Sequence, residues 1–483
     1  MAIVGAGISG ISMAAHMRAA CPDRSFTILE RRSHLGGTWD LFRYPGIRSD
    51  SSMHTLGFGF APWTDETAIA EGAAIRDYLE DVARRHDVSR QIRFDTRVLS
   101  ADWDSASALW TVTVEDESGR HEVHARFVYL ASGYYDYDEP HDPRLPGLER
   151  FSGTVAHPQF WPQDLDWTGK RVVVIGSGAT AVTIVPSMAE RAAHVTMLQR
   201  TPTWMAAGAS VDRFALRLRR FLPRRLAEWL IREKDVRLHD WFFKLARRKP
   251  KGVAKYLSRA LKKELGEHYD PRHFQPPYGP WDQRLCLVPD GDLFAAIGEG
   301  AASIVTDRIA TFEPEGIRLE SGETLPADIV VTATGLKMAI GGGVTVSLDG
   351  EPIDFTQRWF YRSCLFSNVP NLAVVFGYLN ASWTLRADQT ADYVCRVLIR
   401  MQETGAAIAV PHLPKGHGLT EDDIVIFSSG YLQRARSRMP KSAGTLPWRL
   451  NQDYLEDRRN FREVPVDDGV LRFLPVAAAE EIA

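Results

Sequence analysis

Residues 2–10 read Ala-Ile-Val-Gly-Ala-Gly-Ile-Ser-Gly, an apolar run that breaks at a glycine-rich turn and continues with helical spacing to Ala19. In such a GxGxxG turn, the first glycine permits the tight bend and the second lets the backbone approach a pyrophosphate. The third glycine allows the helix to pack closely on the strand. Here these glycines are Gly5, Gly7 and Gly10. We therefore expect a strand, a turn and a helix whose positive end faces a dinucleotide.

A second apolar strand, residues 25–29, ends in Glu30. An acid at this place accepts hydrogen bonds from the hydroxyl groups of a ribose. A glycine turn without any ligand is the alternative interpretation, and the flanking strands and the acid weigh against it. Residues 2–30 thus predict one βαβ half of a doubly wound parallel sheet.

The same pattern recurs in the middle of the chain. A strand over 171–175 precedes a second glycine turn, a helical stretch follows, and another strand covers 194–199. Alanine replaces the third glycine, which the pattern permits. The candidate pyrophosphate-binding residues of this turn are Gly176, Ser177, Gly178, Ala179, Thr180 and Ala181. The predicted fold class is α/β, with two Rossmann-like dinucleotide-binding domains; the first strand starts directly after Met1 and looks clipped beside its counterpart.

The second unit differs from the first where its second strand ends. Arg200 and Thr201 follow that strand in place of an acid. A guanidinium at this position suits the 2′-phosphate of NADPH, whereas a carboxylate would repel it. An ordinary solvated arginine is the alternative. We predict NADPH rather than NADH as the second nucleotide.

Composition limits the remaining classes of function. The chain has 483 residues, 45% of them hydrophobic and 25% charged, with a net charge of −3. This is typical of a soluble protein with more than one domain, and the charge does not favour a nucleic-acid partner. No apolar run approaches the roughly 18 residues of a membrane-spanning helix, and no signal sequence is evident, so we expect a cytoplasmic protein.

The cysteines lie far apart at Cys21, Cys286, Cys364 and Cys395. They form neither a CxxC pair nor a zinc-ligand spacing, so we expect reduced, mostly buried thiols and no metal site. The absence of a redox pair argues against a flavin disulfide reductase. A reduced flavin would then meet another acceptor, of which O2 is the simplest.

Residues 213–263 form a helical, strongly basic stretch with 18 Lys or Arg against 4 Asp or Glu. In one interpretation this is the solvated face of helices that cover the second nucleotide unit, and its field attracts an anionic cofactor. In the other it lies weakly on an anionic membrane surface. We favour the solvated face. The apolar residues that face either a core or a membrane are Phe214, Leu218, Phe221, Leu222, Trp229 and Leu230.

Two longer patterns carry a family resemblance. Residues 151–162 fill every fixed position of an FxGxxxHxxxW fingerprint, with Phe151, Gly153, His157 and Trp161. A second signature, GGxW…RYPG…D, is met by residues 36–39 and 43–46 and by Asp50. Both patterns are those of the type I Baeyer-Villiger monooxygenases, class B flavoprotein monooxygenases, which this chain resembles along its whole length. Residues 282–289 and 380–384 look most like the ethionamide-activating subgroup of that family.

The resemblance implies a discontinuous FAD-binding domain over 1–140 and 337–483. It implies an NADPH-binding domain over 141–210 and 280–336, with the basic helical insertion at 211–279. By residue matching, the FAD contacts would be Ser9, Glu30, Thr38, Trp39, Leu41, Asp50 and Val98, beside the glycine turn. The NADPH contacts would be Arg48, residues 177–181, Thr183, Arg200 and Thr201.

Arg284 matches the active-site arginine of the family, and without the resemblance it would not stand out among 58 basic residues. The implied reaction turns ketones into esters or lactones through a C4a-peroxyflavin, with O2 as co-substrate, and also oxidises sulfides. A permanent positive charge keeps the peroxide ionised and cannot quench it with a proton. We expect Asp50 to pair with Arg284 and to aim it; a purely structural ion pair is the alternative.

Other outcomes remain open at this stage. The same cofactors would serve an N- or S-hydroxylating flavin monooxygenase, which the fingerprint disfavours, or a non-catalytic redox sensor. We favour a hinge and hydrogen-bonding role for His157 over acid-base catalysis. Trp448 either stacks over the active site or packs in the core.

Overall fold

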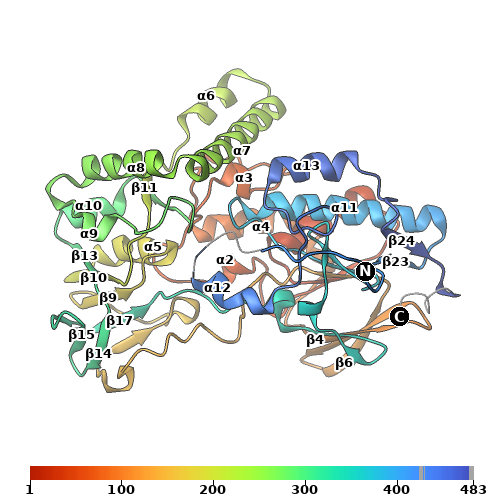
Figure 1. The fold of residues 1–483 in the computed structure, drawn as a ribbon, viewed down its shortest axis with the longest axis horizontal. Helices are drawn as coiled ribbons and strands as arrows, with labels where there is room; N and C mark the ends of the chain where they lie inside the picture. Colours follow the sequence, from red (N-terminus) through yellow and green to blue (C-terminus); the bar gives the residue numbers. More distant parts are fainter. Residues whose placement is uncertain (424–427, 429, 478–483) are drawn as a thin grey trace.

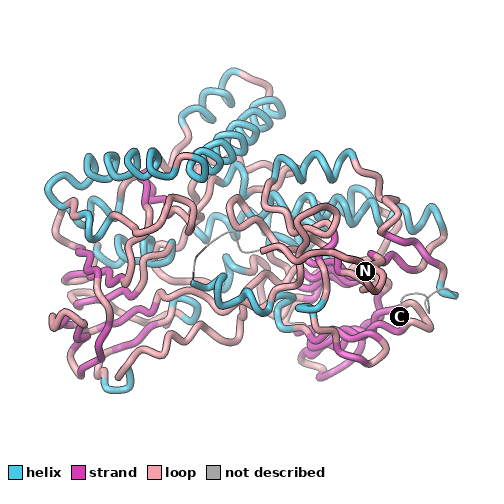
Figure 2. The backbone as a smooth tube through the Cα atoms, viewed as in Figure 1, coloured by secondary structure: helices cyan, strands magenta, loops and turns pink. Residues whose placement is uncertain are grey.

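The computed structural model describes residues 1–423, 428 and 430–477. Two five-stranded sheets form the centres of two α/β units (Figure 1). Helices cover both sheets, and Figure 2 shows long loops between the two units. The predicted fold class is confirmed.

The first unit is built from distant parts of the chain. Its strands run parallel in the order β22-β7-β1-β2-β3. Helix α11 (Trp383–Thr404), from the C-terminal part, lies against α1 (Ile8–Ala20). The strands are β1 (Ala2–Val4), β2 (Thr27–Leu29), β3 (Ile92–Arg93), β7 (Val128–Leu130) and β22 (Leu372–Val374).

The second unit repeats this arrangement. Its parallel strands follow the order β13-β10-β9-β17-β8. Helices α5 (Ala179–Ala189) and α10 (Asp292–Gly298) pack together. The strands are β8 (Thr154–Ala156), β9 (Arg171–Ile175), β10 (His194–Gln199), β13 (Ala302–Thr306) and β17 (Ile329–Thr332).

Smaller elements surround the two units. A mixed sheet, in which β18 pairs parallel with β4, contains β4 (Arg97–Asp104), β5 (Leu109–Asp116), β6 (Gly119–Ala125), β18 (Thr345–Leu348) and β19 (Glu351–Pro352). An antiparallel sheet contains β14 (Ile309–Glu313), β15 (Gly316–Leu319) and β16 (Thr324–Pro326). Further helices are α2 (Thr38–Leu41), α3 (Met53–Leu56), α4 (Gly72–Arg85), α12 (Gly430–Ala435) and α13 (Tyr454–Glu463).

The basic stretch forms three helices, α6 (Arg213–Phe221), α7 (Arg224–Arg248) and α8 (Pro250–Leu265). It leaves the second unit after β11 (Met205–Gly208) and returns through α9 (Pro271–Phe274) to β12 (Cys286–Pro289), which pairs with β11. Figure 1 shows α6 and the start of α7 projecting from the body of the molecule. No helix in the described part of the chain is both long enough and apolar enough to cross a bilayer.

The insertion is also held by the first unit. Arg219 donates to the carbonyl of Trp63 at 2.7 Å, and Arg232 donates to that of Gly57 at 2.8 Å. The Ser52 hydroxyl donates to Asp235 at 2.6 Å. Helix α7 therefore spans both units and stands over the space between them.

The burial pattern explains why the strands read as continuous apolar runs. All three residues of β1 and four of the five residues of β9 are buried. In each unit, helices cover one face of the parallel sheet and a second β-sheet covers the other. Neither face is solvated, so alternation with polar residues is lost. All four cysteines are buried and unpaired, as predicted.

Candidate cofactor site and active site

The first glycine turn leaves no room for side chains. Gly5 has φ +102°, and a Cβ there would lie 2.9 Å from the carbonyl oxygen of Ala131. A Cβ on Gly10 would lie 1.9 Å from the carbonyl oxygen of Gly5. Helix α1 begins after Gly7 without a side-chain cap. Its first N–H groups therefore point out of the turn with no side-chain acceptor, an arrangement that suits an anionic ligand.

Glu30 lies buried beside this turn, at the end of β2. Its carboxylate accepts hydrogen bonds from the backbone N–H of Ala6 at 2.6 Å and of Arg32 at 2.9 Å. Burial raises the pKa of Glu30, and the two N–H donors oppose this rise. A carboxylate has further lone pairs, so Glu30 keeps acceptor capacity for ribose hydroxyls.

The GGTW segment packs on the same turn. Gly36 donates to the carbonyl of Ala6 at 3.0 Å, and a Cβ on Gly37 would lie 3.0 Å from the Cα of Gly7. Thr38 shares a hydrogen bond with the hydroxyl of Tyr135. The predicted cofactor residues Thr38, Trp39 and Leu41 are thus close to the turn.

Two other predicted flavin contacts have defined neighbours in the fold. The Ser9 hydroxyl accepts a hydrogen bond from the indole of Trp383 at 2.8 Å, so this side chain already has a protein partner. Val98 is half-buried on β4, two residues beyond Thr96, whose N–H donates to the carbonyl of Glu30 at 2.9 Å. Both residues therefore lie in the part of the first unit that the dinucleotide pattern marks.

The second glycine turn is more open. Gly176 has φ +141°, and a Cβ there would lie 2.3 Å from the carbonyl oxygen of Ala333. Around Gly178, by contrast, a Cβ would meet nothing within 4 Å. Helix α5 begins without a side-chain cap, and the Ser177 hydroxyl donates to the carbonyl of Thr201 at 3.1 Å. The turn is therefore shaped to receive a ligand beside Gly178.

The two units share a feature that the glycine patterns do not reveal. Ala131-Ser132-Gly133 follows β7, and Ala333-Thr334-Gly335 follows β17. Each alanine carbonyl lies against the first glycine of its unit. The hydroxyls of Ser132 and Thr334 are buried without a hydrogen-bond partner. Buried polar groups of this kind commonly meet a ligand or water, so both sites fit a bound nucleotide.

Arg200 is exposed directly after β10 and enters none of the ion pairs recorded between residues 1–423, 428 and 430–477. Arg434 lies near it, because the charge of Arg200 contributes, after burial, to lowering the pKa of Arg434. Two guanidinium groups near each other favour the binding of an anion, and a 2′-phosphate has suitable charge and acceptor oxygens.

The RYPG segment reaches from the first unit to the second. Gly46 has φ +73°, and a Cβ there would lie 1.9 Å from the Ser187 hydroxyl on α5. It would also lie 3.1 Å from the carbonyl oxygen of Thr183, a predicted NADPH contact. Arg48 pairs with Asp292 at 2.5 Å, yet its Nη2 is buried without a partner. That nitrogen is available to a ligand between the units.

Asp50, the end of this signature, forms the predicted ion pair with Arg284. The guanidinium lies 3.2 Å from the carboxylate. The side chains are 38% and 40% exposed. Both line one cavity of about 910 Å³. The pair therefore stands at a surface that a small molecule can reach.

The cavity is lined mainly by apolar side chains. Besides the Arg284–Asp50 pair, its polar and charged lining residues include Ser52, Thr55, Asp235, His239, Asp240, Lys249, Asn380, Ser382 and Gln452. The apolar lining comes mainly from α7 and α8 and from Trp281, and includes Val236, Leu238, Trp241, Phe242, Phe243, Leu245, Val253 and Tyr256. Sequence reasoning missed these residues. Their helices read as a basic surface, and only a count of apolar residues on the faces of α7 could have marked them.

His239 and Trp281 form one wall of the cavity. Their rings meet edge to face at 5.3 Å, and Phe243 meets Trp281 at 5.4 Å. His239 also hydrogen-bonds the carbonyl of Asn380. Burial lowers the pKa of His239, which therefore stays neutral at physiological pH.

The fingerprint residues lie outside the cavity lining. Phe151 packs against Phe312 at 6.0 Å, and a Cβ on Gly153 would lie 2.4 Å from the carbonyl oxygen of Asp328. Trp161 meets Trp167 at 6.4 Å. These contacts hold the segment against the second sheet.

His157 is a structural hydrogen-bonding residue in this arrangement. Its Nδ1 accepts from the backbone N–H of Gln159 at 3.1 Å, and the Gln159 amide donates to the carbonyl of Asp136 at 2.7 Å. Its Nε2 is buried without a partner, and burial lowers its pKa. The segment thus links the end of the first unit to the second.

Trp448 is a core residue rather than part of the cavity. Its side chain is 6% exposed and meets Tyr361 edge to face at 5.5 Å. Of the two interpretations open from the sequence, packing in the core holds.

Comparison with known proteins shows the family to which the chain belongs. Residues 1–255 match the family model described as flavin-binding monooxygenase-like. The chain is 47% identical over 473 residues to the FAD-containing monooxygenase EthA of Mycobacterium tuberculosis, covering 98% of this chain and 96% of the relative. It is 46% identical over 474 residues to the probable FAD-binding monooxygenase AlmA of Acinetobacter baylyi, covering 98% and 95%.

Solved structures share the fold at lower identity. A steroid monooxygenase bound to NADP matches with a TM-score of 0.77 and 23% identity, covering 98% of this chain and 99% of that one. A cyclohexanone monooxygenase matches with a TM-score of 0.75 and 21% identity, covering 98% and 99%. The chain therefore belongs to the flavin-binding monooxygenase-like family.

Proposed function

We propose that the protein is an FAD-dependent monooxygenase that consumes NADPH and O2 and converts ketones to esters or lactones. The same enzyme oxidises thioethers and thioamides at sulfur. One observation carries the proposal: the Arg284–Asp50 pair lines a mainly apolar cavity of about 910 Å³. The FAD-containing relatives support the assignment of the cofactor.

The first unit holds FAD in this proposal. The uncapped start of α1 receives the pyrophosphate, and Glu30 accepts the ribose hydroxyls. The remaining contacts are those assigned by residue matching, at Ser9, Thr38, Trp39, Leu41, Asp50 and Val98. FAD, once reduced, supplies the activated oxygen that is transferred.

The second unit holds NADPH. Its pyrophosphate lies at the uncapped start of α5, where Gly178 leaves open space. Arg200 binds the 2′-phosphate, and Arg48 turns its unpartnered nitrogen toward the nucleotide. The fingerprint segment around His157 acts as the hinge that lets the nicotinamide approach the flavin and then make way for substrate.

Arg284 stabilises the negative charge that develops on oxygen during the transfer. Its guanidinium is always charged and donates hydrogen bonds without giving up a proton. Asp50 orients the guanidinium and balances its charge when the site is empty. A substrate that fills the cavity displaces water from around Arg284, which strengthens the field of the guanidinium at the reacting atoms. The apolar walls favour a ketone or sulfide with an apolar body.

The decisive experiment replaces Arg284 by alanine in the FAD-loaded protein. We expect ester formation from small linear, cyclic and aryl ketones to fall on the order of 100-fold or more, because a charge-stabilising donor is lost. Reduction of the flavin by NADPH should remain. It is measured as the loss of flavin absorbance. Arg248→Ala, at an exposed arginine of α7 outside the cavity lining, is the matched control.

Two outcomes would contradict the proposal. Ester formation by Arg284→Ala at the rate of the unchanged enzyme would exclude the role of the guanidinium. Oxidation of amines or sulfides without any ester from ketones would instead favour the N- or S-hydroxylating reaction. Products are identified by mass spectrometry in both cases.

A further inference from the structure

The tip of the helical insertion carries charge of one sign. Residues 213–226 contain arginine at six positions and no acid, namely Arg213, Arg217, Arg219, Arg220, Arg224 and Arg225. Arg219 pairs with the buried Glu228 at 2.9 Å. The other five enter none of the ion pairs recorded within the described parts of the chain. The tip is therefore a concentrated, uncompensated positive surface.

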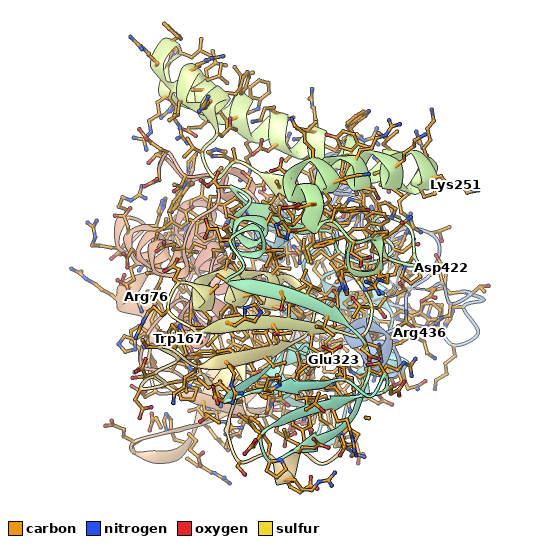
Figure 3. The ribbon with its side chains drawn as sticks, turned by 90° about the vertical axis from the view of Figure 1, so that its left-hand side faces the viewer. Arg76, Trp167, Lys251, Glu323, Asp422 and Arg436 are labelled. Atoms are coloured by element: carbon orange, nitrogen blue, oxygen red, sulfur yellow. The ribbon has the colours of Figure 1, made fainter. Side chains whose placement is uncertain are left out.

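Large apolar side chains are exposed among these arginines. Phe214 is 47% exposed, Phe221 76%, Leu226 44% and Trp229 56%. Further exposed apolar residues on the insertion are Leu238, Trp241 and Tyr256. Figures 1 and 3 both show this helical hairpin standing out from the body, and no other segment among the described residues covers its end.

The mouth of the substrate cavity opens on the same face. Leu238, Trp241 and Tyr256 are at once exposed and part of the cavity lining. On α7, residues 226, 229, 238 and 241 fall within about half of the helix circumference, since each residue advances roughly 100°. The exposed surface therefore continues from the tip to the cavity entrance.

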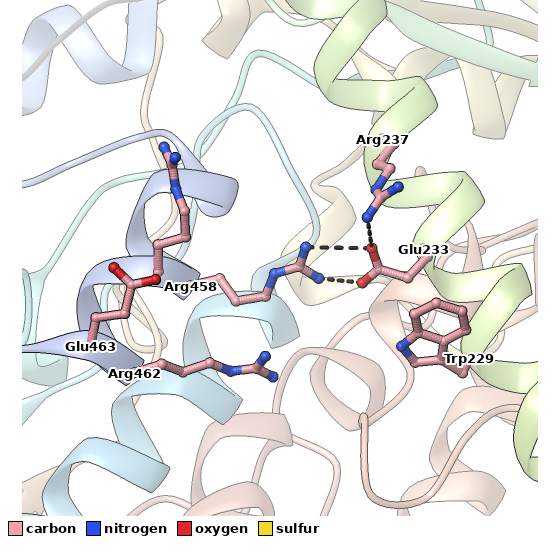
Figure 4. Close-up of a pocket in the computed structure, with 7 residues that line it drawn as sticks. Trp229, Glu233, Arg237, Arg458, Arg462 and Glu463 are labelled. Atoms are coloured by element: carbon pink, nitrogen blue, oxygen red, sulfur yellow. Dashed lines mark hydrogen bonds and ion pairs between the residues drawn. The ribbon is translucent and has the colours of Figure 1, made fainter.

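A basic groove adjoins Trp229. It has a volume of about 300 Å³ and runs between α7 and α13. Figure 4 shows Arg458 and Arg237 bound to Glu233, with Arg462 extending along the other side toward Trp229. The groove holds four arginines and two acids, namely Arg237, Arg458, Arg459, Arg462, Glu233 and Glu463. Its net positive charge suits a phosphate-sized anion beside an exposed indole.

We infer that this face docks on a bilayer of anionic phospholipid. A purely solvated face accounts for the arginines and leaves the exposed phenylalanines and tryptophan without a function. A membrane surface accounts for both, because the apolar side chains enter the interface while the arginines meet the headgroup phosphates. Provided that the proposed function holds, apolar substrates then enter the cavity directly from the lipid.

The test measures flotation of the FAD-loaded protein with vesicles, in the absence of NADPH and substrate. One set contains phosphatidylcholine alone, and in the other a third of the lipid is phosphatidylglycerol. We expect binding to the second set, and release at high salt because screening weakens the attraction. Binding to both sets alike, or to neither, would overturn the inference.

Two sets of substitutions separate the apolar and the electrostatic parts. Phe214→Ser with Phe221→Ser should weaken binding on the order of tenfold or more, because each phenylalanine loses its buried area. Arg217→Gln, Arg220→Gln, Arg224→Gln and Arg225→Gln together should weaken it at least as much and remove the salt dependence.

Matched controls lie elsewhere on the surface. They are Phe94→Ser, at another exposed phenylalanine, and Arg90→Gln, Arg93→Gln, Arg126→Gln and Arg472→Gln, at exposed arginines. These controls should bind vesicles like the unchanged protein. If light scattering shows a dimer that the phenylalanine substitutions dissociate while vesicle binding is unaffected, a second copy of the chain covers this face and the inference fails. Because no substrate is present, failure here leaves the proposed reaction untouched.

Discussion

The Arg284–Asp50 ion pair is partly exposed to solvent, so its contribution to stability is small. Both side chains are about two-fifths exposed, at 38% and 40%, so water screens their attraction. Ion pairs of this kind contribute about 0 to 1 kcal/mol. In the proposed reaction, little free energy would therefore be lost when the guanidinium turns from Asp50 toward the reacting oxygen.

Arg200 should decide the choice between the two nicotinamide nucleotides. Arg200→Gln removes the positive charge that faces the 2′-phosphate, so we expect the KM for NADPH to rise roughly tenfold or more. The KM for NADH should stay unchanged, because NADH lacks that phosphate. Initial rates of nucleotide oxidation with both cofactors measure the ratio.

The control for this substitution is Lys170→Gln, at an exposed residue just before β9, at the opposite end of the strand from the glycine turn. It removes the same charge from the same unit. An equal loss of NADPH affinity in both variants would show that the general field, and not Arg200 itself, selects the nucleotide.

Helices α1 and α5 both begin at a glycine turn, but the two turns differ in how much room they leave for a side chain. A Cβ on Gly10 would meet the backbone of the preceding strand end at 1.9 Å, whereas a Cβ on Gly178 would meet nothing within 4 Å. Gly178 has φ −80° and ψ −177°, an extended conformation that alanine adopts without strain. The fold therefore does not require glycine at position 178, and in the proposed function the nucleotide does.

This contrast gives a prediction for the two helices. Gly178→Ala should leave the melting temperature within a few degrees of its original value and raise the KM for NADPH roughly tenfold, because the methyl group occupies the pyrophosphate site. Gly10→Ala should lower the melting temperature and the FAD content together, because the helix is forced away from its strand. Thermal unfolding and the ratio of flavin to protein absorbance measure both effects.

An unchanged KM for NADPH in Gly178→Ala would contradict the assignment of the second turn to that nucleotide. Gly298→Ala serves as the control, since a Cβ there also meets nothing within 4 Å and the residue ends α10 just before β13, at the opposite end of the parallel sheet from the glycine turn.

The whole molecule should lose stability in mildly acidic solution. Burial lowers the pKa of several histidines below their ordinary value of 6.5, among them His54, His157 and His239. These groups stay neutral in the folded protein, while the unfolded chain takes up protons at higher pH. The resulting stability is fully present above pH 6.5 and is lost as the pH falls through the lowered values.

Urea unfolding between about pH 7.5 and about pH 5 should therefore show a falling free energy of unfolding. His239→Gln removes one of these groups and should make the decline shallower, whatever its effect at neutral pH. His34→Gln, at an exposed histidine, is the control and should leave the slope as it is. A slope that is the same with and without His239 would contradict this account.

Much of the fold could be predicted from the sequence because it depends on contacts between residues close together in the chain. The glycines at 5, 10 and 176 are required by contacts within a few residues and one neighbouring strand, and buried parallel strands show as apolar runs, so the α/β class follows from short stretches. The Arg284–Asp50 pair was predicted across 234 positions, but through the family resemblance and not through any local pattern.

The cavity and the exposed hairpin belong to long-range packing. Val236 is buried on α7 while Leu238, two residues later, is exposed, although both are aliphatic. The periodicity of a helix shows that it has an apolar face. Which apolar residues are buried depends on the elements that pack against the helix, and these come from distant parts of the chain. The sequence alone therefore could not decide whether Phe214 and Phe221 face a core or the outside of the protein. In the fold they lie on a projecting tip, where nothing in the described chain covers them.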